Sequence, residues 1–176
     1  MTKRKRSAFR RLEHDLYDTP AEAVWELLKE LEDPTRFVEP CVGNGSLVGH
    51  LKRAGHVLVG AYDLPDDARV KRYDLPAGAE FITNPPYWGQ PRDLHPLIAN
   101  LSSQAPTWLL MASDWLINEG SAAMMPRLRR VVAVGRVKWM PDTKFTGFDN
   151  AVWCRFGLPR DEEPRFINRR TRRGRS

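Results

Sequence analysis

The sequence predicts an α/β protein whose mostly parallel sheet carries helices on both faces. Short apolar runs alternate with segments of helical periodicity from residue 20 onward, a pattern typical of parallel sheets covered by helices. The unusual residues, mainly Gly, Asp and an Asn-Pro-Pro run, follow the apolar runs, where open α/β sheets bind their ligands. The last two apolar runs, 130–140 and 150–156, are joined without a helix and form a closing strand pair.

The first half of the chain alternates between helix and strand. Thr19 as N-cap and Pro20 at the first helical position begin a helix that Asp33-Pro34 ends. Gly55 closes the second helix. After the first helix, the expected elements are strand 36–41, turn 42–45, helix 46–55, and strands 56–64 and 79–83.

The second half continues the alternation and then ends in strands. Pro96 is expected to interrupt or restart its first helix. The expected elements are helix 91–104, strand 107–113, a helix or broken helix at 114–128, strand 130–140, loop 141–149 and strand 150–156.

Composition favours one globular domain of 176 residues, with 41% hydrophobic residues to form a core. No apolar run approaches the roughly 20 residues of a membrane helix, and the charged N-terminus is not followed by the apolar stretch of a secretion signal. Cys41 and Cys154 lack metal-ligand spacing, so no metal is expected. We therefore expect a cytoplasmic protein that does not enter a membrane.

The positive charge lies at the two ends of the chain. Residues 1–11 carry +6 and residues 160–176 carry +4, so the total of +6 leaves −4 for residues 12–159. Basic arms of this kind contact phosphate backbones without reading sequence. Solubilising ends are the alternative interpretation.

The first strand runs into the turn "EPCVGNG" (39–45). Gly43 and Gly45 allow a tight turn and the close approach of a ligand before the next helix begins. The pattern is neither a P-loop nor a complete G-x-G-x-x-G, and Glu39 would repel a phosphate but suits a cation or a hydroxyl. An ordinary tight turn is the alternative.

Two aspartates follow the next strand. Asp63 lies 20 residues beyond Gly43, the spacing of acids that accept ribose hydroxyls in dinucleotide sites. Asp74 precedes the third strand and could accept a hydrogen bond from the exocyclic amine of a purine. A turn or capping aspartate is the alternative for Asp63, and a solvent-exposed turn acid is the alternative for Asp74.

The third strand ends in Asn84-Pro85-Pro86-Tyr87. The Asn84 oxygen and the Pro85 carbonyl, held rigid by Pro86, can accept both N–H groups of a planar amine and so prepare its lone pair for attack. Tyr87 offers a face on which a base stacks. Trp88 is either a second wall for the base or packs under the loop.

These motifs together resemble the S-adenosylmethionine-dependent amino-methyltransferases of nucleic acids, particularly their adenine-N6 branch. "YDTP" (17–20) resembles the N-terminal cofactor motif of that family, "EPCVGNG" its acid-Pro-x-x-Gly-x-Gly motif, and "NPPY" its catalytic motif. Asp63 matches its ribose-binding acid, and Asp74 its contact to the cofactor adenine. The motifs stand in the family's order, and the resemblance spans roughly residues 15–156.

The resemblance implies a class I, Rossmann-like methyltransferase fold: a seven-stranded sheet with an antiparallel last strand. It implies that S-adenosylmethionine is held by Tyr17, Thr19, Pro20, Glu39, Pro40, Cys41, Gly43, Asn44, Gly45, Asp63, Leu64 and Asp74. The target amine would be held by Asn84, Pro85, Pro86 and Tyr87.

The loop after residue 140 carries further expected substrate contacts. By resemblance, Phe148 or Phe145 packs against the extruded base from the side opposite Tyr87, and Lys144 contacts a phosphate. Packing within a hairpin loop is the alternative for the two phenylalanines.

The expected organisation is a basic arm at 1–14, a catalytic domain at 15–158 and a basic tail at 159–176. The expected activity is methylation of adenine N6 in DNA with base flipping. Weak or short sequence preference is expected, because little chain remains for a recognition domain. Compact enzymes of this type are frequent in bacteriophages. RNA adenine, a protein glutamine amide, a non-catalytic binding module and a separate recognition subunit remain alternatives, and the sequence leaves monomer or dimer open.

Overall fold

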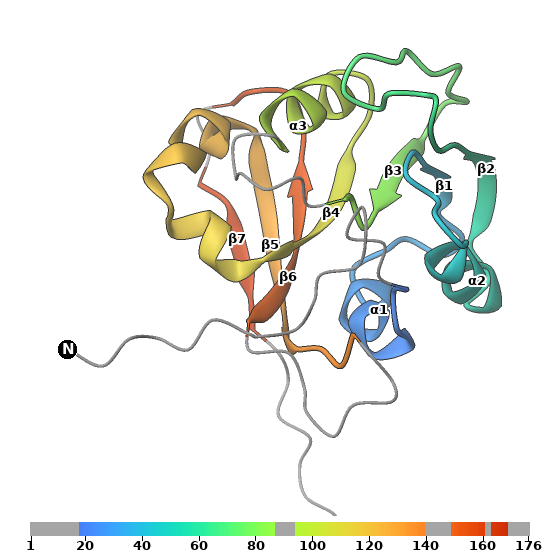
Figure 1. The fold of residues 1–176 in the computed structure, drawn as a ribbon, viewed down its shortest axis with the longest axis horizontal. Coiled ribbons are helices and arrows are strands. Elements are labelled where there is room, and N and C mark those ends of the chain that lie inside the picture. Colours follow the sequence, from blue (N-terminus) through green and yellow to red (C-terminus); the bar gives the residue numbers. More distant parts are fainter. Residues whose placement is uncertain (1–17, 87–93, 140–148, 161–162, 169–176) are drawn as a thin grey trace, which may run out of the picture.

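A seven-stranded sheet forms the centre of the computed structural model, which describes residues 18–86, 94–139, 149–160 and 163–168 (Figure 1). The strands lie in the order β2-β1-β3-β4-β6-β5-β7. Strand β6 is antiparallel to both of its neighbours, and the other neighbouring pairs are parallel, which confirms the predicted α/β class. The strands are β1 Arg36–Glu39, β2 Val57–Ala61, β3 Ala79–Thr83, β4 Thr107–Ala112, β5 Leu128–Arg136, β6 Asn150–Phe156 and β7 Arg165–Ile167.

Helices cover both faces of this sheet. Helices α1 and α2 share one apolar cluster with the sheet, in which Leu27 and Leu51 pack with Trp153. Helix α3 packs on the other face beside two 3₁₀ segments, and Leu101 and Trp115 belong to that second cluster. Within the described ranges, no helix is long and apolar enough to span a bilayer. The bounds are α1 Ala21–Leu28, α2 Ser46–Arg53, α3 Leu94–Ser102, η3 Ser113–Ile117 and η4 Glu119–Arg127.

Helix α1 begins later than the sequence predicts. Pro20 occupies its N-cap position in an extended conformation, with φ −74° and ψ 153°, and no side chain caps the helix. The prediction that Thr19 is the N-cap is therefore wrong. The physical reason is that the Thr19 hydroxyl accepts a hydrogen bond from Asn84, on a distant part of the chain.

The segments around Pro96 and 114–128 also differ in detail from the prediction. Helix α3 begins at Leu94, so Pro96 lies in its first turn, where a missing N–H breaks no helical hydrogen bond. Within Leu94–Ser102 the proline therefore does not interrupt the helix, and residues 91–93 of the predicted helix lie outside the described residues. The second segment forms 3₁₀ turns, and Pro126 lies inside the longer one.

The seventh strand comes from the segment expected to be part of the basic tail. Strand β6 is the antiparallel strand expected at 150–156, but β7 follows it in the chain and pairs in parallel with β5. Ile167 pairs in register with Val132 and packs against the α1/α2 cluster. Three residues among charged neighbours are too few for a periodic strand pattern, so the sequence does not reveal this element.

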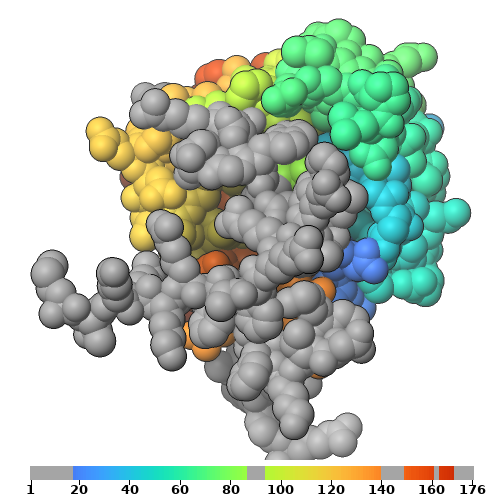
Figure 2. All heavy atoms as spheres, in the orientation of Figure 1, coloured from blue at the N-terminus to red at the C-terminus, as the bar shows by residue number. Residues whose placement is uncertain are grey.

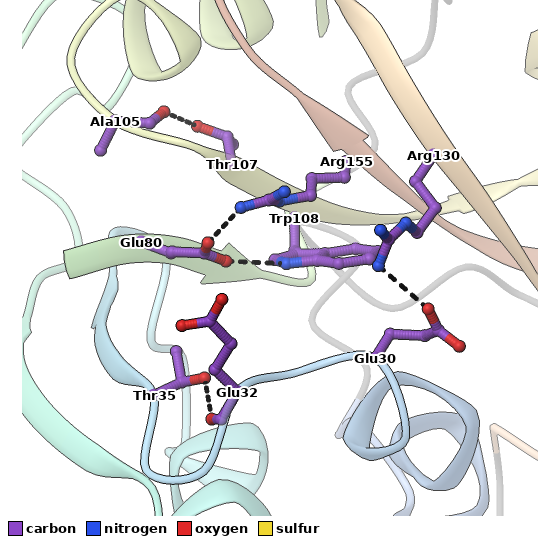
Figure 3. Close-up of polar contacts among 9 residues, drawn as sticks. All are labelled: Glu30, Glu32, Thr35, Glu80, Ala105, Thr107, Trp108, Arg130 and Arg155. Atoms are coloured by element: carbon purple, nitrogen blue, oxygen red, sulfur yellow. Dashed lines mark hydrogen bonds and ion pairs between the residues drawn. The ribbon is translucent and has the colours of Figure 1, made fainter. Parts of the chain in front are cut away.

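At the amino edge of the sheet, two acids tie the strands and α1 together (Figure 3). Glu80 on β3 accepts a hydrogen bond of 2.9 Å from Nε1 of the buried Trp108 and pairs with Arg155 on β6. Glu30, after α1, pairs with Arg130 on β5 at 3.0 Å. Trp108, Arg155 and Arg130 are register partners on adjacent strands, so these contacts link β3, β4, β6 and β5 at the edge opposite the candidate site.

Candidate active site

Three parallel strands bring their carboxyl ends to one edge of the sheet. Strand β1 ends at Glu39, the loop after β2 carries Asp63, and Asn84 follows β3. Because β1 lies between β2 and β3, these side chains surround a common cavity. Its volume of about 320 Å³ is typical of small-molecule sites. The cavity is lined by Asp18, Thr19, Glu39, Cys41, Val42, Gly43, Asn44, Ser46, Leu47, Asp63, Asn84 and Pro86.

The space-filling view shows one face of the molecule (Figure 2). The loop 62–78, in green, and helix α2, in cyan, form one flank of the visible face. The 3₁₀ segments, in gold, form the opposite flank.

The turn between β1 and α2 needs its two glycines. Gly43 and Gly45 have φ values of 50° and 81°, in the left-handed region that side chains with a Cβ disfavour. Gly45 is the N-cap of α2, and its carbonyl accepts the N–H of Gly49 at 2.9 Å. A Cβ built on Gly45 would meet no heavy atom within 4 Å, so glycine serves the backbone conformation at this position.

Asp63 joins the loops after β1 and β2. Its Oδ2 accepts the N–H of Gly43 at 3.0 Å, and its Oδ1 accepts the N–H of Leu64 at 2.9 Å. The N–H of Tyr62 also donates to the carbonyl of Glu39 at 2.9 Å. Each carboxylate oxygen can accept further hydrogen bonds, so Asp63 presents an exposed, fixed acceptor at the cavity.

Glu39 is buried against the cavity, with 1% of its surface exposed. Burial raises the pKa of its carboxyl to about 8, and the nearby charge of Asp63 raises that pKa further. The N–H of Cys41 donates to Oε1 at 3.1 Å, which partly opposes the rise. The side chain of Thr83 also lowers the pKa of Glu39, although its hydroxyl has no hydrogen bond of standard geometry with the described residues.

The lining is acidic and, among the residues that the structure describes, contains no lysine or arginine. Asp18, Glu39 and Asp63 line it, so the cavity disfavours a phosphate and suits a cation. Burial also raises the pKa of the Cys41 thiol to about 12, which keeps it protonated and a weak nucleophile. Within the described ranges, no cluster of three His, Cys, Asp or Glu side chains could hold a metal ion.

The Asn84 side chain leaves one acceptor without a partner. Its Nδ2 donates to Oγ1 of Thr19 at 3.1 Å. Its Oδ1 is buried and has no hydrogen-bond partner among the described residues. A buried acceptor in this state costs about 1–3 kcal/mol, and Asn84 is a residue that lines the cavity, so a ligand donor that reached this oxygen would be stabilised. Asn84 can therefore bind the N–H of a ligand.

Most predicted site residues in the described ranges lie at this edge. Those that line the cavity are Thr19, Glu39, Cys41, Gly43, Asn44, Asp63, Asn84 and Pro86. Those that do not line it are Pro20, Pro40, Gly45, Leu64, Asp74 and Pro85. Asp74 is exposed, and its contact with a cofactor remains a prediction. The predictions that lie outside the described residues are Tyr17, Tyr87, Trp88, Lys144, Phe145 and Phe148.

Four residues of the lining were not predicted from the sequence: Asp18, Val42, Ser46 and Leu47. Asp18 stands inside the "YDTP" motif, and it accepts a hydrogen bond from Nδ2 of Asn44. Its place between two predicted site residues was the available signal. The other three flank the glycine turn, where their apolar or small side chains gave no sign of a ligand contact.

The sheet order and the cavity at the carboxyl edge define a class I methyltransferase fold, and solved structures show the same fold. No protein-family model and no curated protein matches the sequence. A putative class I S-adenosylmethionine-dependent methyltransferase from Listeria monocytogenes superposes with a TM-score of 0.54 at 8% identity. That match covers 91% of this chain and 68% of the other.

Two further solved structures share this fold. A modification subunit of a putative type I restriction enzyme from Vibrio vulnificus YJ016 gives a TM-score of 0.54 at 12% identity, over 91% of this chain and 48% of that one. A putative RNA methyltransferase from Pyrococcus horikoshii gives 0.56 at 13% identity, over 82% of this chain and 88% of that one. This chain therefore spans about half the length of the modification subunit. At these identities the likeness establishes the fold.

Proposed function

We propose that the protein methylates the exocyclic N6 amine of adenine in DNA, with S-adenosylmethionine as the methyl donor. The observation that carries the proposal is the buried Oδ1 of Asn84, a residue that lines the cavity, because this oxygen has no hydrogen-bond partner among the described residues. A planar amine supplies the donor that this oxygen lacks. The "NPPY" context of Asn84 supports an amine of a base rather than a hydroxyl as the acceptor of the methyl group.

The cavity fits the proposed cofactor. S-adenosylmethionine supplies a methyl group on a sulfonium, and its transfer to an amine releases S-adenosylhomocysteine and a proton. The cationic groups of that molecule suit the carboxyls of Asp18 and Glu39, and its ribose hydroxyls suit the exposed oxygens of Asp63. The glycine turn lets the backbone approach the ligand closely. In this proposal, Asp74 and Leu64 contact the cofactor adenine from the loop after β2.

The chain's own residues would orient the target base. Asn84 Oδ1 accepts one amine proton and the carbonyl of Pro85, held rigid by Pro86, accepts the other. Tyr87 stacks on the base, with Trp88 as a second wall or as packing under the loop, and Phe148 or Phe145 lies on the opposite side. Orientation of the amine, more than acid–base catalysis, supplies the acceleration. The Cys41 thiol, with its raised pKa, takes no part as a nucleophile.

DNA is the substrate that the charge distribution favours. The basic segments 1–14 and 159–176 and Lys144 would contact phosphates without reading sequence, which predicts weak or short sequence preference. An adenine N6 inside a duplex is out of reach, so the base must flip at a cost of a few kcal/mol. The likeness to a type I modification subunit supports DNA.

RNA adenine is the second candidate, because the putative RNA methyltransferase superposes with a similar TM-score and over more of its own length. A protein glutamine amide presents a similar planar NH₂ group, but the basic ends of this chain favour a polyanion. A non-catalytic binding module would not require the glycine turn, Asp63 and the unpartnered Asn84 oxygen together.

A substrate panel tests the proposal. The full-length protein is incubated with S-adenosylmethionine labelled on the methyl group and with single-stranded DNA, duplex DNA, RNA or glutamine peptides, and the products are digested and identified by mass spectrometry. We expect N6-methyladenine in DNA. Label in RNA adenine or in glutamine would move the activity to those substrates, and no transfer to any of them would contradict the proposal.

A further inference from the structure

Thr19 connects the site to α2 through two hydrogen bonds. Its side chain is 5% exposed, and its Oγ1 accepts Nδ2 of Asn84 at 3.1 Å. Its carbonyl lies 3.0 Å from Nε2 of His50 on α2. Thr19 thus contacts Asn84 with its side chain and α2 with its backbone.

The second hydrogen bond has a defined direction because of Arg53. A guanidinium N–H can only donate, and Nη2 of Arg53 lies 2.7 Å from Nδ1 of His50. Nδ1 therefore accepts, and the proton of the neutral imidazole resides on Nε2. Nε2 then donates to the Thr19 carbonyl, which gives a continuous chain from Arg53 through His50 and Thr19 to Asn84.

Helix α1 holds the same segment against the sheet from the other side. Trp153 on β6 donates its Nε1–H to the carbonyl of Ala23 at 2.7 Å, and the N–H of Lys138 donates to Oε1 of Glu22 at 2.7 Å. Both contacts join residues more than 100 positions apart. They fix the start of α1, two residues beyond Thr19, to strand β6 and to the end of β5.

We infer that Thr19 is a positioning residue for Asn84, with His50 behind it. The Thr19 hydroxyl holds the Asn84 amide plane, and with it the orientation of the unpartnered Oδ1. Without that hydroxyl, the carboxamide can rotate about its terminal bond, which has a broad torsional preference. Thr19 thereby affects turnover more than cofactor binding, although it also lines the cavity. The consequence for turnover rests on the proposed function, whereas the coupling of Thr19 to Asn84 does not.

The coupling is tested in the free protein. Thr19→Val removes the hydroxyl at similar volume, and Thr19→Ser keeps it. Thr107→Val is the matched control, because Thr107 is a fully buried threonine at the amino edge of the sheet and its hydroxyl donates to the carbonyl of Ala105. In a double-mutant cycle of urea unfolding with Asn84→Ala, we expect Thr19→Val to be non-additive and Thr107→Val to be additive. The Asn84 side-chain NH₂ resonances should shift in Thr19→Val and return toward wild type in Thr19→Ser. Additive effects and unshifted resonances would overturn the inference.

Turnover gives the second test. We expect Thr19→Val to lower the single-turnover methyl-transfer rate about tenfold or more while S-adenosylmethionine affinity changes less than threefold, and Thr19→Ser to restore the rate. His50→Gln keeps a donor toward Thr19 and should retain more activity than His50→Leu. A loss of cofactor affinity with an unchanged rate would make Thr19 a cofactor ligand only and overturn the positioning role. An inactive wild type would refute the proposed function, and the unfolding cycle would still decide the coupling.

Discussion

Replacing Glu39 by Gln tests the electrostatic basis of the cavity. The carboxyl is buried and its pKa is raised to about 8, mainly by burial. At pH 7 about nine in ten of these carboxyls are then protonated in the free protein, and at pH 8 about half. A cation in the cavity favours the ionised form. Binding of S-adenosylmethionine should therefore release close to one proton at pH 7 and about half a proton at pH 8.

The same linkage fixes the pH dependence of affinity. As pH increases toward 8, the affinity for S-adenosylmethionine should rise by up to about tenfold per pH unit, equivalent to about 1.4 kcal/mol. Above pH 9 the affinity should level off. Calorimetric titration in two buffers of different ionisation enthalpy counts the released protons. Glu39→Gln cannot ionise, so it should bind more weakly at pH 9, release no proton and lose the slope. The explanation would be refuted if Glu39→Gln still released a proton on binding, or if the wild-type protein released none.

The stability of the free protein should change in the opposite direction. Since the folded-state pKa of Glu39 lies above its ordinary value of 4.5, the native state binds more protons than the unfolded state between these two pH values. The free energy of unfolding should therefore fall as pH rises from about 5 to 8, by a few kcal/mol at most from this group. Glu39→Gln should flatten that part of the curve in urea titrations.

Three further substitutions separate the parts of the structure. Asp63→Asn replaces one carboxylate oxygen with an NH₂ group beside the N–H groups of Gly43 and Leu64. The affinity for S-adenosylmethionine should therefore fall by about 10- to 100-fold in calorimetry. An unchanged affinity would show that Asp63 does not belong to the site. Glu80→Ala leaves Trp108 Nε1 without its acceptor and Arg155 without its acid. The free energy of unfolding in urea should therefore fall by about 2 kcal/mol, while the affinity for S-adenosylmethionine stays constant. Gly45→Ala should cost about 1–2 kcal/mol of backbone strain at φ 81° without a steric clash, and a larger loss would show that space also matters there.

The meeting of Glu39, Asp63 and Asn84 could be predicted from sequence because it follows from topology. Each follows an apolar run, and parallel strands bring their carboxyl ends to one edge. The glycine turn could also be predicted from the sequence, since positive φ values favour glycine strongly. Local patterns of this kind are short in sequence and need no knowledge of distant partners.

The contacts that the sequence did not reveal are long-range. The Thr19 hydroxyl looked like a helix cap, yet its partner Asn84 lies 65 residues away. Strand β7 is three residues long, so its pairing with β5 has no periodic signal. The pairing of Glu80 with Trp108 and Arg155 depends on strand order and register, which follow only from the folded sheet.

The most direct test of the central claim compares Asn84→Ala with wild type in a single turnover on adenine-containing DNA. Cofactor binding is measured in parallel by calorimetry. The proposal predicts that Asn84→Ala binds S-adenosylmethionine within about threefold of wild type and transfers the methyl group at least about 100-fold more slowly, because the amine loses its buried acceptor. A variant that forms N6-methyladenine at the wild-type rate would contradict the assignment of Asn84 and the function built on it.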